Sequence, residues 1–347
     1  MIDVGLIGFG FAGRTFHAPV IIAVEGLRLA AILQRNGDDA AQAYPAARVV
    51  RSLDELLAIG SIRLVVIATP NTSHIELAKQ CLLAGRDVVI DKPFAPTYAE
   101  AAELVELARQ RNRLLSVYQN RRWDGDFLTV RRLIAEEHFG RIVLFESHFD
   151  RFRPTLKENA WRERAEPGSG VLFDLGPHLI DQAMVLFGEP EAISADVRIE
   201  RDGAAADDAF DVALHYPRMR ALLRASVLVS TQTPRFAIQG TRGGYLKFGL
   251  DPQEDALKRG EAPVGERWGC ESPERWGTLS RAQGDSRATE TCPTEPGDYR
   301  QYYANLRDAL RGTAPLAVTP QQTLRVMRAL ELAHQSSRQR RSLPWPG

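Results

Sequence analysis

Val4-Gly5-Leu6-Ile7-Gly8-Phe9-Gly10-Phe11-Ala12-Gly13 is the stretch that decides the fold of this chain. It opens with a short apolar run, which predicts a buried strand, and continues with the spacing G-x-G-x-x-G at the start of a helix. In that setting Gly8 permits a tight turn, Gly10 lets a pyrophosphate approach the backbone, and Gly13 lets the helix pack close to the strand. The N-terminus of the helix attracts the anion. The stretch therefore predicts a dinucleotide-binding loop, and a glycine-rich turn without a ligand is the alternative.

The rest of the first third alternates apolar runs with helical segments. Runs at 29–33, 64–68, 88–90 and 114–118 suit parallel strands that are buried on both faces. Capping boxes at Ser52 to Glu55 and at Thr97 to Glu100 mark helix starts, and Gly85 is expected to follow a helix end. Alternating strands and helices predict a doubly wound parallel sheet of the α/β class, which is a Rossmann domain over residues 1–120.

Beyond residue 120 a second domain is expected. A helix over 123–137 and another over 178–187 accompany a series of predicted strands at 142–149, 193–199, 210–216, 221–230, 236–239 and 245–248. The polar segment 252–296 is expected to form loops with short helices, and the last helix begins at Thr319-Pro320. We predict an α/β domain over 121–347 with a large, mostly antiparallel open sheet for substrate binding and dimerisation, whose last helix is a candidate to pack back on the first domain.

Composition narrows the class of partner. The 347 residues carry 44 Lys+Arg and 44 Asp+Glu, so nothing favours nucleic acid or a membrane surface, and a small molecule is the expected ligand. The three cysteines, Cys81, Cys270 and Cys292, fit neither a zinc site nor a disulfide framework. No secretory signal pattern opens the chain, so we expect a cytoplasmic protein without a metal.

The end of the second strand bears on the cofactor. NAD-specific sites usually place a carboxylate about 20 residues after the glycine loop, where it binds the ribose 2′-hydroxyl. Here the strand runs into Gln34-Arg35-Asn36, where no carboxylate would repel a phosphate and Arg35 can pair with one. NADP is the predicted cofactor, with NAD as the second choice, and a solvated surface arginine is the alternative reading of Arg35.

Two short segments suggest the chemistry. Lys92, in Asp91-Lys92-Pro93, follows a predicted strand at the edge where open α/β sheets bind ligands. His178, after Pro177, is expected in the first turn of its helix, where the helix dipole disfavours imidazolium. Oxidation of an alcohol by hydride transfer needs a base and a cation for the developing alkoxide, roles that His178 and Lys92 can fill while Asp174 orients. The alternatives to these catalytic roles are that Lys92 lies in an ordinary turn and that His178 is a capping or core residue of its helix.

Together these segments resemble the Gfo/Idh/MocA family, the group of glucose–fructose oxidoreductase and inositol dehydrogenase, over essentially the whole chain. The resemblance is carried by 8–13, 68–74, 91–93 and 170–181, with Asp91 where the family usually has Glu. It implies an NAD(P)-dependent dehydrogenase acting on CH–OH groups, with Lys92, Asp174 and His178 as its catalytic set. It also implies that Thr69, Pro70, Asn71 and His74 line the cofactor cleft, and that the exposed sheet face makes a homodimer or homotetramer.

A closer resemblance is to the NADP-type scyllo-inositol dehydrogenases of that family. It is carried by 116–124, 151–154 and 253–257, and it implies a cyclic polyol substrate. Tyr118, Arg153 and Trp161, with His178, are the candidates for the substrate wall, and packing between the domains is the alternative. The same chemistry on an aldose, a glycoside or a biliverdin-like pigment stays open, as do a non-catalytic NADP-binding regulator and an enzyme that recycles a permanently bound cofactor.

Overall fold

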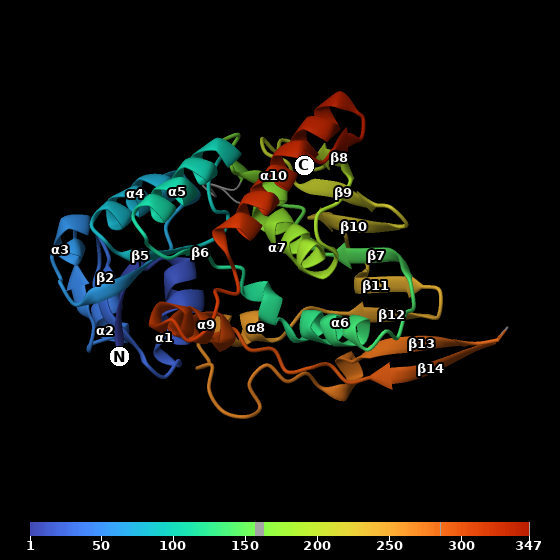
Figure 1. Ribbon diagram of the computed structural model, residues 1–347, viewed down its shortest axis with the longest axis horizontal. Helices are drawn as coiled ribbons and strands as arrows, with labels where there is room; N and C mark the ends of the chain where they lie inside the picture. Colours follow the sequence, from blue (N-terminus) through green and yellow to red (C-terminus); the bar gives the residue numbers. More distant parts are fainter. Residues whose placement is uncertain (157–162, 285, 347) are drawn as a thin grey trace. The chain divides into compact units, whose positions relative to one another are not determined.

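The computed structural model describes residues 1–156, 163–284 and 286–346, so Trp161 lies outside the described residues. The chain divides into two compact units, each made of three segments (Figure 1). Unit 1 comprises Met1–Trp123, Pro252–Trp268 and Asp298–Leu324, and unit 2 comprises Asp124–Asp251, Gly269–Gly297 and Arg325–Gly347. This differs from the contiguous division at 120/121 because two later segments join the N-terminal unit.

The core of unit 1 explains its extra segments. Trp268, Tyr299, Tyr302 and Leu306 belong to the same buried apolar cluster as residues of the first two strands. Helices α8 (Gln253–Lys258) and α9 (Arg300–Arg311) therefore complete the N-terminal unit. Burial of the apolar side chains of this cluster contributes favourably to the free energy of folding of unit 1.

Unit 1 is built on a six-stranded sheet in the order β3-β2-β1-β4-β5-β6, parallel throughout, as predicted for a Rossmann domain. Its strands are β1 (Ile2–Ile7), β2 (Leu27–Leu33), β3 (Arg48–Val50), β4 (Ile62–Ile67), β5 (Asp87–Ile90) and β6 (Leu115–Val117). Every residue of β1, β5 and β6 is buried, which explains why their sequences are mostly apolar, with Asp3, Asp87 and Ser116 as buried polar exceptions. Strand β3 was not predicted, because only one of its three residues is buried and its sequence is therefore not an apolar run.

Two helices of unit 1, α3 (Leu53–Leu57) and α5 (Tyr98–Gln110), begin at the predicted caps. The unit also contains α1 (Ala18–Ile22), α2 (Asp39–Ala43) and α4 (His74–Leu83), with short η turns at Gly13–His17, Asn71–Ser73 and Asn120–Trp123. The Ser52 and Thr97 hydroxyls accept the backbone N–H groups of Glu55 and Glu100, which confirms both predicted helix starts, while the two carboxylates accept from these hydroxyls. Gly85 has a φ of 75°, as expected after the end of α4. Figure 1 shows α4 and α5 side by side.

Unit 2 contains a nine-stranded sheet in the order β14-β13-β12-β11-β7-β10-β9-β8-β15. All its neighbours are antiparallel except β7 and β10, which confirms the predicted mostly antiparallel sheet. Its strands are β7 (Ile142–His148), β8 (Ala192–Arg198), β9 (Ala209–Tyr216), β10 (Met219–Ser226), β11 (Pro234–Gly240), β12 (Gly243–Phe248), β13 (Gly277–Gln283), β14 (Ser286–Cys292) and β15 (Leu343–Pro344). Helix α6 (Gly125–Ala135) also belongs to this unit, and α7 (Gly170–Phe187) packs on β9 and β10.

Two expectations for unit 2 are wrong. The segment 252–296 contains the hairpin β13–β14, which forms one edge of the sheet (Figure 1, orange), where loops and short helices were predicted. Most hairpin side chains are exposed, so the sequence lacks the alternation that marks a half-buried strand. The second is α7, which starts at Gly170 and holds Pro177 in its interior, so Pro177 does not mark a helix start.

The last helix, α10 (Pro320–Gln339), has the predicted cap. The Thr319 hydroxyl accepts the Gln322 backbone N–H, and the Gln322 side chain accepts the Thr319 N–H. The boundary between the two units falls inside this helix. Across the described ranges, the structure has no helix with the length and apolar character that crossing a bilayer requires.

Candidate active site

The glycine loop is shaped as a phosphate cradle. Gly8 has a φ of 96°, and a Cβ there would lie 2.6 Å from the Ala68 carbonyl oxygen. A Cβ at Gly13 would overlap the carbonyl oxygen of Gly8, so both positions require glycine for backbone packing. A Cβ at Gly10 would meet nothing within 4 Å. The space before Gly10, at the N-terminal end of the helical segment 11–22, therefore fits a pyrophosphate that approaches the backbone.

Strand β2 ends at the residues expected to face the adenosine ribose. Arg35 is exposed, and the Gln34 amide accepts the Ala40 N–H and donates to Asp39. The guanidinium of Arg51, which follows β3, donates to the carbonyl oxygens of Gln34 and Gly37 at 2.9 and 2.6 Å. Arg51 also forms an ion pair of 2.6 Å with Asp38. Asp38 is the first carboxylate after Arg35 in the sequence, and the Arg51 guanidinium balances its negative charge.

The loop after β4 is tied to the loop after β5. His74, 1% exposed, places Nε2 2.9 Å from the Thr69 carbonyl oxygen and Nδ1 3.0 Å from the Pro93 carbonyl oxygen. Burial lowers the pKa of His74. The Thr69 hydroxyl accepts from Ser73, and Asn71 is 2% exposed. His74 thus holds the two loops together, which is a positioning contact where the sequence suggested a lining residue.

Lys92 lies on this second loop, beside a buried polar chain. The Asp91 carboxylate accepts the Lys92 backbone N–H at 2.8 Å and lies 3.7 Å from His17 Nε2, while His17 Nδ1 lies 2.6 Å from the Tyr303 hydroxyl. Burial alone would raise the pKa of Asp91, but the neighbouring His17 and the charge of Lys92 bring it below its usual range. A carboxylate therefore anchors the backbone of Lys92.

Tyr118 does not fit the predicted substrate wall. It is 2% exposed, and its hydroxyl donates to the Phe16 carbonyl oxygen at 3.1 Å. Its ring packs against those of His17, Tyr302 and Tyr303 in unit 1, with centroid separations of 4.4, 4.9 and 5.6 Å. These contacts make Tyr118 part of the unit 1 core.

Helix α7 carries the candidate residues of unit 2. Asp174 and His178 follow Gly170 at intervals of four, so all three lie on one face of the helix. Asp174 lies 3.6 Å from the Arg151 guanidinium, and His178 is 4% exposed. Because α7 begins at Gly170, His178 lies two turns inside the helix, and the expected effect of an N-terminal dipole on it is wrong.

A polar pocket lies beside Asp174 in unit 2. Arg153, a predicted substrate residue, lines it together with Asp174, Arg151, Thr155, Glu163, Gly170, Val171, Arg201, Ala204, Ala206, Asp207 and Val227. Three arginines and three carboxylates therefore face one space. The sequence pointed to Arg153 and Asp174 but missed Arg201 and Asp207, because they come from the connection between β8 and β9.

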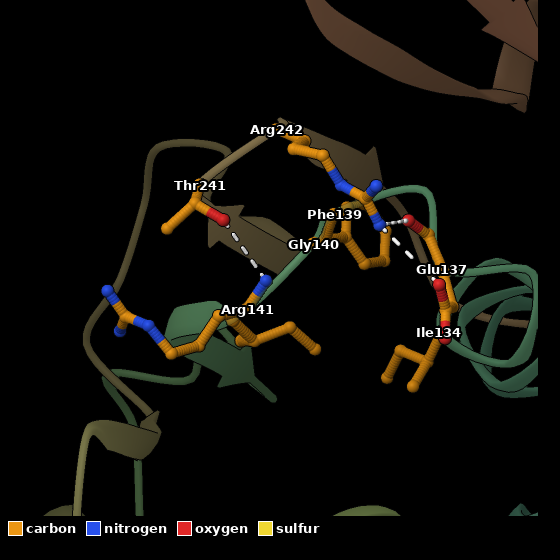
Figure 2. A pocket seen from close by; sticks show the side chains of 8 residues that line it. Ile134, Glu137, Phe139, Gly140, Arg141, Thr241 and Arg242 are labelled. Carbon is orange, nitrogen blue, oxygen red and sulfur yellow. Dashed lines mark hydrogen bonds and ion pairs between the residues drawn. The ribbon is translucent and has the colours of Figure 1, made fainter.

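Two further hollows in the described part of the chain are lined by residues other than the predicted site residues. Figure 2 shows one in unit 2 lined by Ile134, Glu137, Phe139, Gly140, Arg141, Ile142, Thr241 and Arg242, where Arg242 reaches toward Glu137. The Thr241 hydroxyl in it accepts the Arg141 backbone N–H at 3.1 Å. Within the described ranges, no group of three or more His, Cys, Asp or Glu side chains could hold a metal ion.

Comparison with known proteins identifies both parts of the chain. Residues 2–119 match the family model described as the NAD-binding Rossmann fold of the Gfo/Idh/MocA oxidoreductase family. Residues 131–345 match the model of the C-terminal alpha/beta domain of the same family. Together the two matches cover most of the chain.

Similar proteins align along nearly the whole length. The uncharacterized oxidoreductase YdgJ of Escherichia coli (strain K12) is 45% identical over 99% of this chain and 98% of its own. The scyllo-inositol 2-dehydrogenase (NADP(+)) IolW of Bacillus subtilis (strain 168) is 36% identical over 99% and 95%. The solved structure of the oxidoreductase YPO2259 from Yersinia pestis has a TM-score of 0.95 at 44% identity, covering 100% and 97%. The chain therefore belongs to the Gfo/Idh/MocA family and is an NAD(P)-dependent oxidoreductase.

Proposed function

We propose that the protein transfers hydride between NADP and a secondary hydroxyl of a cyclic polyol of the scyllo-inositol type. The observation that carries the substrate class is the pocket that Asp174 helps to line, where three arginines and three carboxylates offer hydrogen-bond donors and acceptors. A hydroxyl both donates and accepts hydrogen bonds, so a ring of hydroxyls matches such a wall of donors and acceptors. The 36% identity with IolW supports the same class.

The preference for NADP rests on the end of β2. Arg35 is exposed where a 2′-phosphate would bind, and the carboxylates of Asp38 and Asp39 are engaged by Arg51 and Gln34. A guanidinium binds phosphate oxygens strongly and with defined geometry. Gly8, Phe9, Gly10, Phe11, Ala12 and Gly13 would hold the pyrophosphate, with Thr69, Pro70, Asn71 and Lys92 as further cofactor contacts.

The catalytic roles divide among three side chains. When bound, NADP supplies or accepts the hydride. His178 takes the hydroxyl proton as the alcohol is oxidised and returns it in reduction. The Lys92 ammonium stabilises the developing alkoxide, and its backbone is held by Asp91. Asp174, paired with Arg151, accepts a hydrogen bond from the substrate and orients it.

The first test is a substrate and cofactor panel. Initial rates are measured by absorbance of the reduced nicotinamide with scyllo-inositol and myo-inositol, each with NADP and with NAD. Turnover of scyllo-inositol with a preference for NADP would support the proposal. Turnover of an aldose or a glycoside instead would replace the substrate, and tight NADP binding without turnover of any polyol or sugar would favour a regulator.

Single substitutions test the roles with matched controls. Lys92→Ala and His178→Ala should each lower kcat at least about a hundredfold, the usual effect of losing acid–base or alkoxide catalysis. Lys79→Ala removes a lysine that pairs with Glu103 at 3.6 Å, and His138→Ala removes a histidine that bonds Glu136 at 2.8 Å. Both controls should keep full turnover. Activity retained in Lys92→Ala and His178→Ala would refute the assigned roles.

A further inference from the structure

The start of α7 lacks a cap from its own sequence. Ser169 precedes the helix, but its hydroxyl donates to the carbonyl oxygens of Arg164 and Glu166 rather than accepting from the first turn. The first turn also contains no acidic residue. Its free N–H groups therefore need an acceptor from elsewhere in the chain, because an unsatisfied donor at a helix start is costly.

Asp207, from the connection between β8 and β9, provides this acceptor. Its carboxylate accepts the Leu172 backbone N–H at 2.7 Å, and its carbonyl oxygen accepts the Val171 N–H at 2.8 Å. Gly170 has a φ of 84°, and a Cβ there would overlap the Asp207 carboxylate. Asp207 thus sits against the helix in the space that a side chain at 170 would fill.

The neighbouring residue makes this contact rigid. Asp208, fully buried, accepts the Glu200 backbone N–H at 2.6 Å and the Arg201 Nε–H at 2.9 Å. Its own backbone pairs with Arg198 and Val227 at 3.0 and 3.1 Å. Asp207 is therefore presented to α7 from a segment that is bonded on both sides.

The helix face links Asp207 to the candidate catalytic residues. Gly170, Asp174 and His178 follow at intervals of four, so the carboxylate of Asp207 lies one turn before Asp174 on that face. We infer that Asp207 is a positioning residue, which fixes the start of α7 and through it the orientation of Asp174 and His178. The kinetic part of this inference rests on the proposed function. Asp207 also lines the pocket together with Arg151, Arg153, Glu163 and Arg201. Direct contact between its carboxylate and the substrate is therefore the competing role.

The test compares three variants at Asp207 with one control. Asp207→Asn keeps an oxygen acceptor, and Asp207→Ala removes it. Asp207→Ser, whose side chain is too short to reach the Leu172 N–H, is used in place of Asp207→Ala if the alanine variant does not fold. Asp202→Ala, an exposed aspartate of the same connection, is the matched control. Hydrogen–deuterium exchange of the first turn of α7 is measured together with kcat and with KM for polyol and for NADP.

We expect Asp207→Ala to speed exchange of the Leu172 amide, which loses its side-chain acceptor, at least about tenfold and to lower kcat about 10- to 100-fold, since small misplacements of catalytic groups are costly. KM for NADP should stay within about twofold, and Asp207→Asn should remain within about threefold of the wild type throughout. Unchanged exchange in Asp207→Ala would overturn the inference. So would a raised polyol KM in Asp207→Asn with normal exchange, which would make Asp207 a substrate contact. If the wild type turns over no polyol, the proposed function fails, while exchange still decides the role of Asp207.

Discussion

Asp207 also predicts how stability should vary with pH. Burial, with the adjacent charge of Asp208, raises the pKa of its carboxyl from 3.8 to about 6 in the folded protein, against the opposing hydrogen bonds of Leu172 and Val171. A group with a raised folded pKa contributes stability that is fully present below about pH 4 and is lost as the pH rises through about 6. A rise of this size corresponds to about 3 kcal/mol for a fully buried group. Because Asp207 is partly exposed, we expect about 1–2 kcal/mol.

Asp207→Asn isolates this effect because an amide does not titrate. The difference in free energy of unfolding, variant minus wild type, should increase by about 1–2 kcal/mol when the pH is raised from about 4 to about 7.5, because only the wild type loses stability over this range. Urea unfolding followed by circular dichroism at both pH values measures the difference, with Asp202→Asn as the exposed control. A difference between variant and wild type that is the same at both pH values would refute the reasoning, because the carboxyl would then titrate alike in the folded and unfolded chain.

Three further predictions concern the cofactor loop, a buried ion pair and the ribose end. Gly10→Ala should weaken NADP binding at least about tenfold in a fluorescence titration and leave the free energy of unfolding unchanged. Gly13→Ala should lower both the affinity for NADP and the free energy of unfolding, because its Cβ would overlap the backbone. Lys247→Met should cost up to about 3 kcal/mol in urea unfolding, since the buried Glu271 carboxylate loses the ammonium 3.1 Å away and keeps the Arg275 guanidinium at 3.8 Å, and adding Glu271→Leu should recover much of the loss. Arg35→Ala should raise the Kd for NADP about tenfold and leave that for NAD unchanged, and an equal loss for both would contradict the phosphate contact.

The Rossmann half of the fold could be predicted because its signals are local. Residues 88–90 of the buried strand β5 appear as an apolar run, and the caps at Ser52 and Thr97 need only neighbours three residues away. The hairpin of β13 and β14 gave no such signal. Its side chains are mostly exposed, so polar residues occur on both faces and only pairing with β12 reveals the strands.

The start of α7 shows how a correct local rule can mislead. Proline is favoured in the first helical turn, so Pro177 pointed to a helix beginning there. The real start is at Gly170, and Asp207, 35 residues beyond Leu172 in the chain, supplies the cap. A contact between segments so far apart leaves no pattern in the helix sequence itself. Asp174 and His178 were recognised from their motif, but the residue that holds their helix could be found only in the folded chain.

The loop that carries Lys92 accounts for the one departure from the family pattern noted in the sequence. An aspartate at position 91 can accept the N–H of the next residue, as it does at 2.8 Å, because Asx side chains are short enough to bond their own local backbone. The same carboxylate lies beside His17, while His74 bonds the Pro93 carbonyl oxygen on the other side of Lys92. Two buried histidines and one carboxylate thus restrain the loop from both ends. The Asp91 carboxylate therefore supports the backbone of Lys92 directly, at the position where the family usually has Glu.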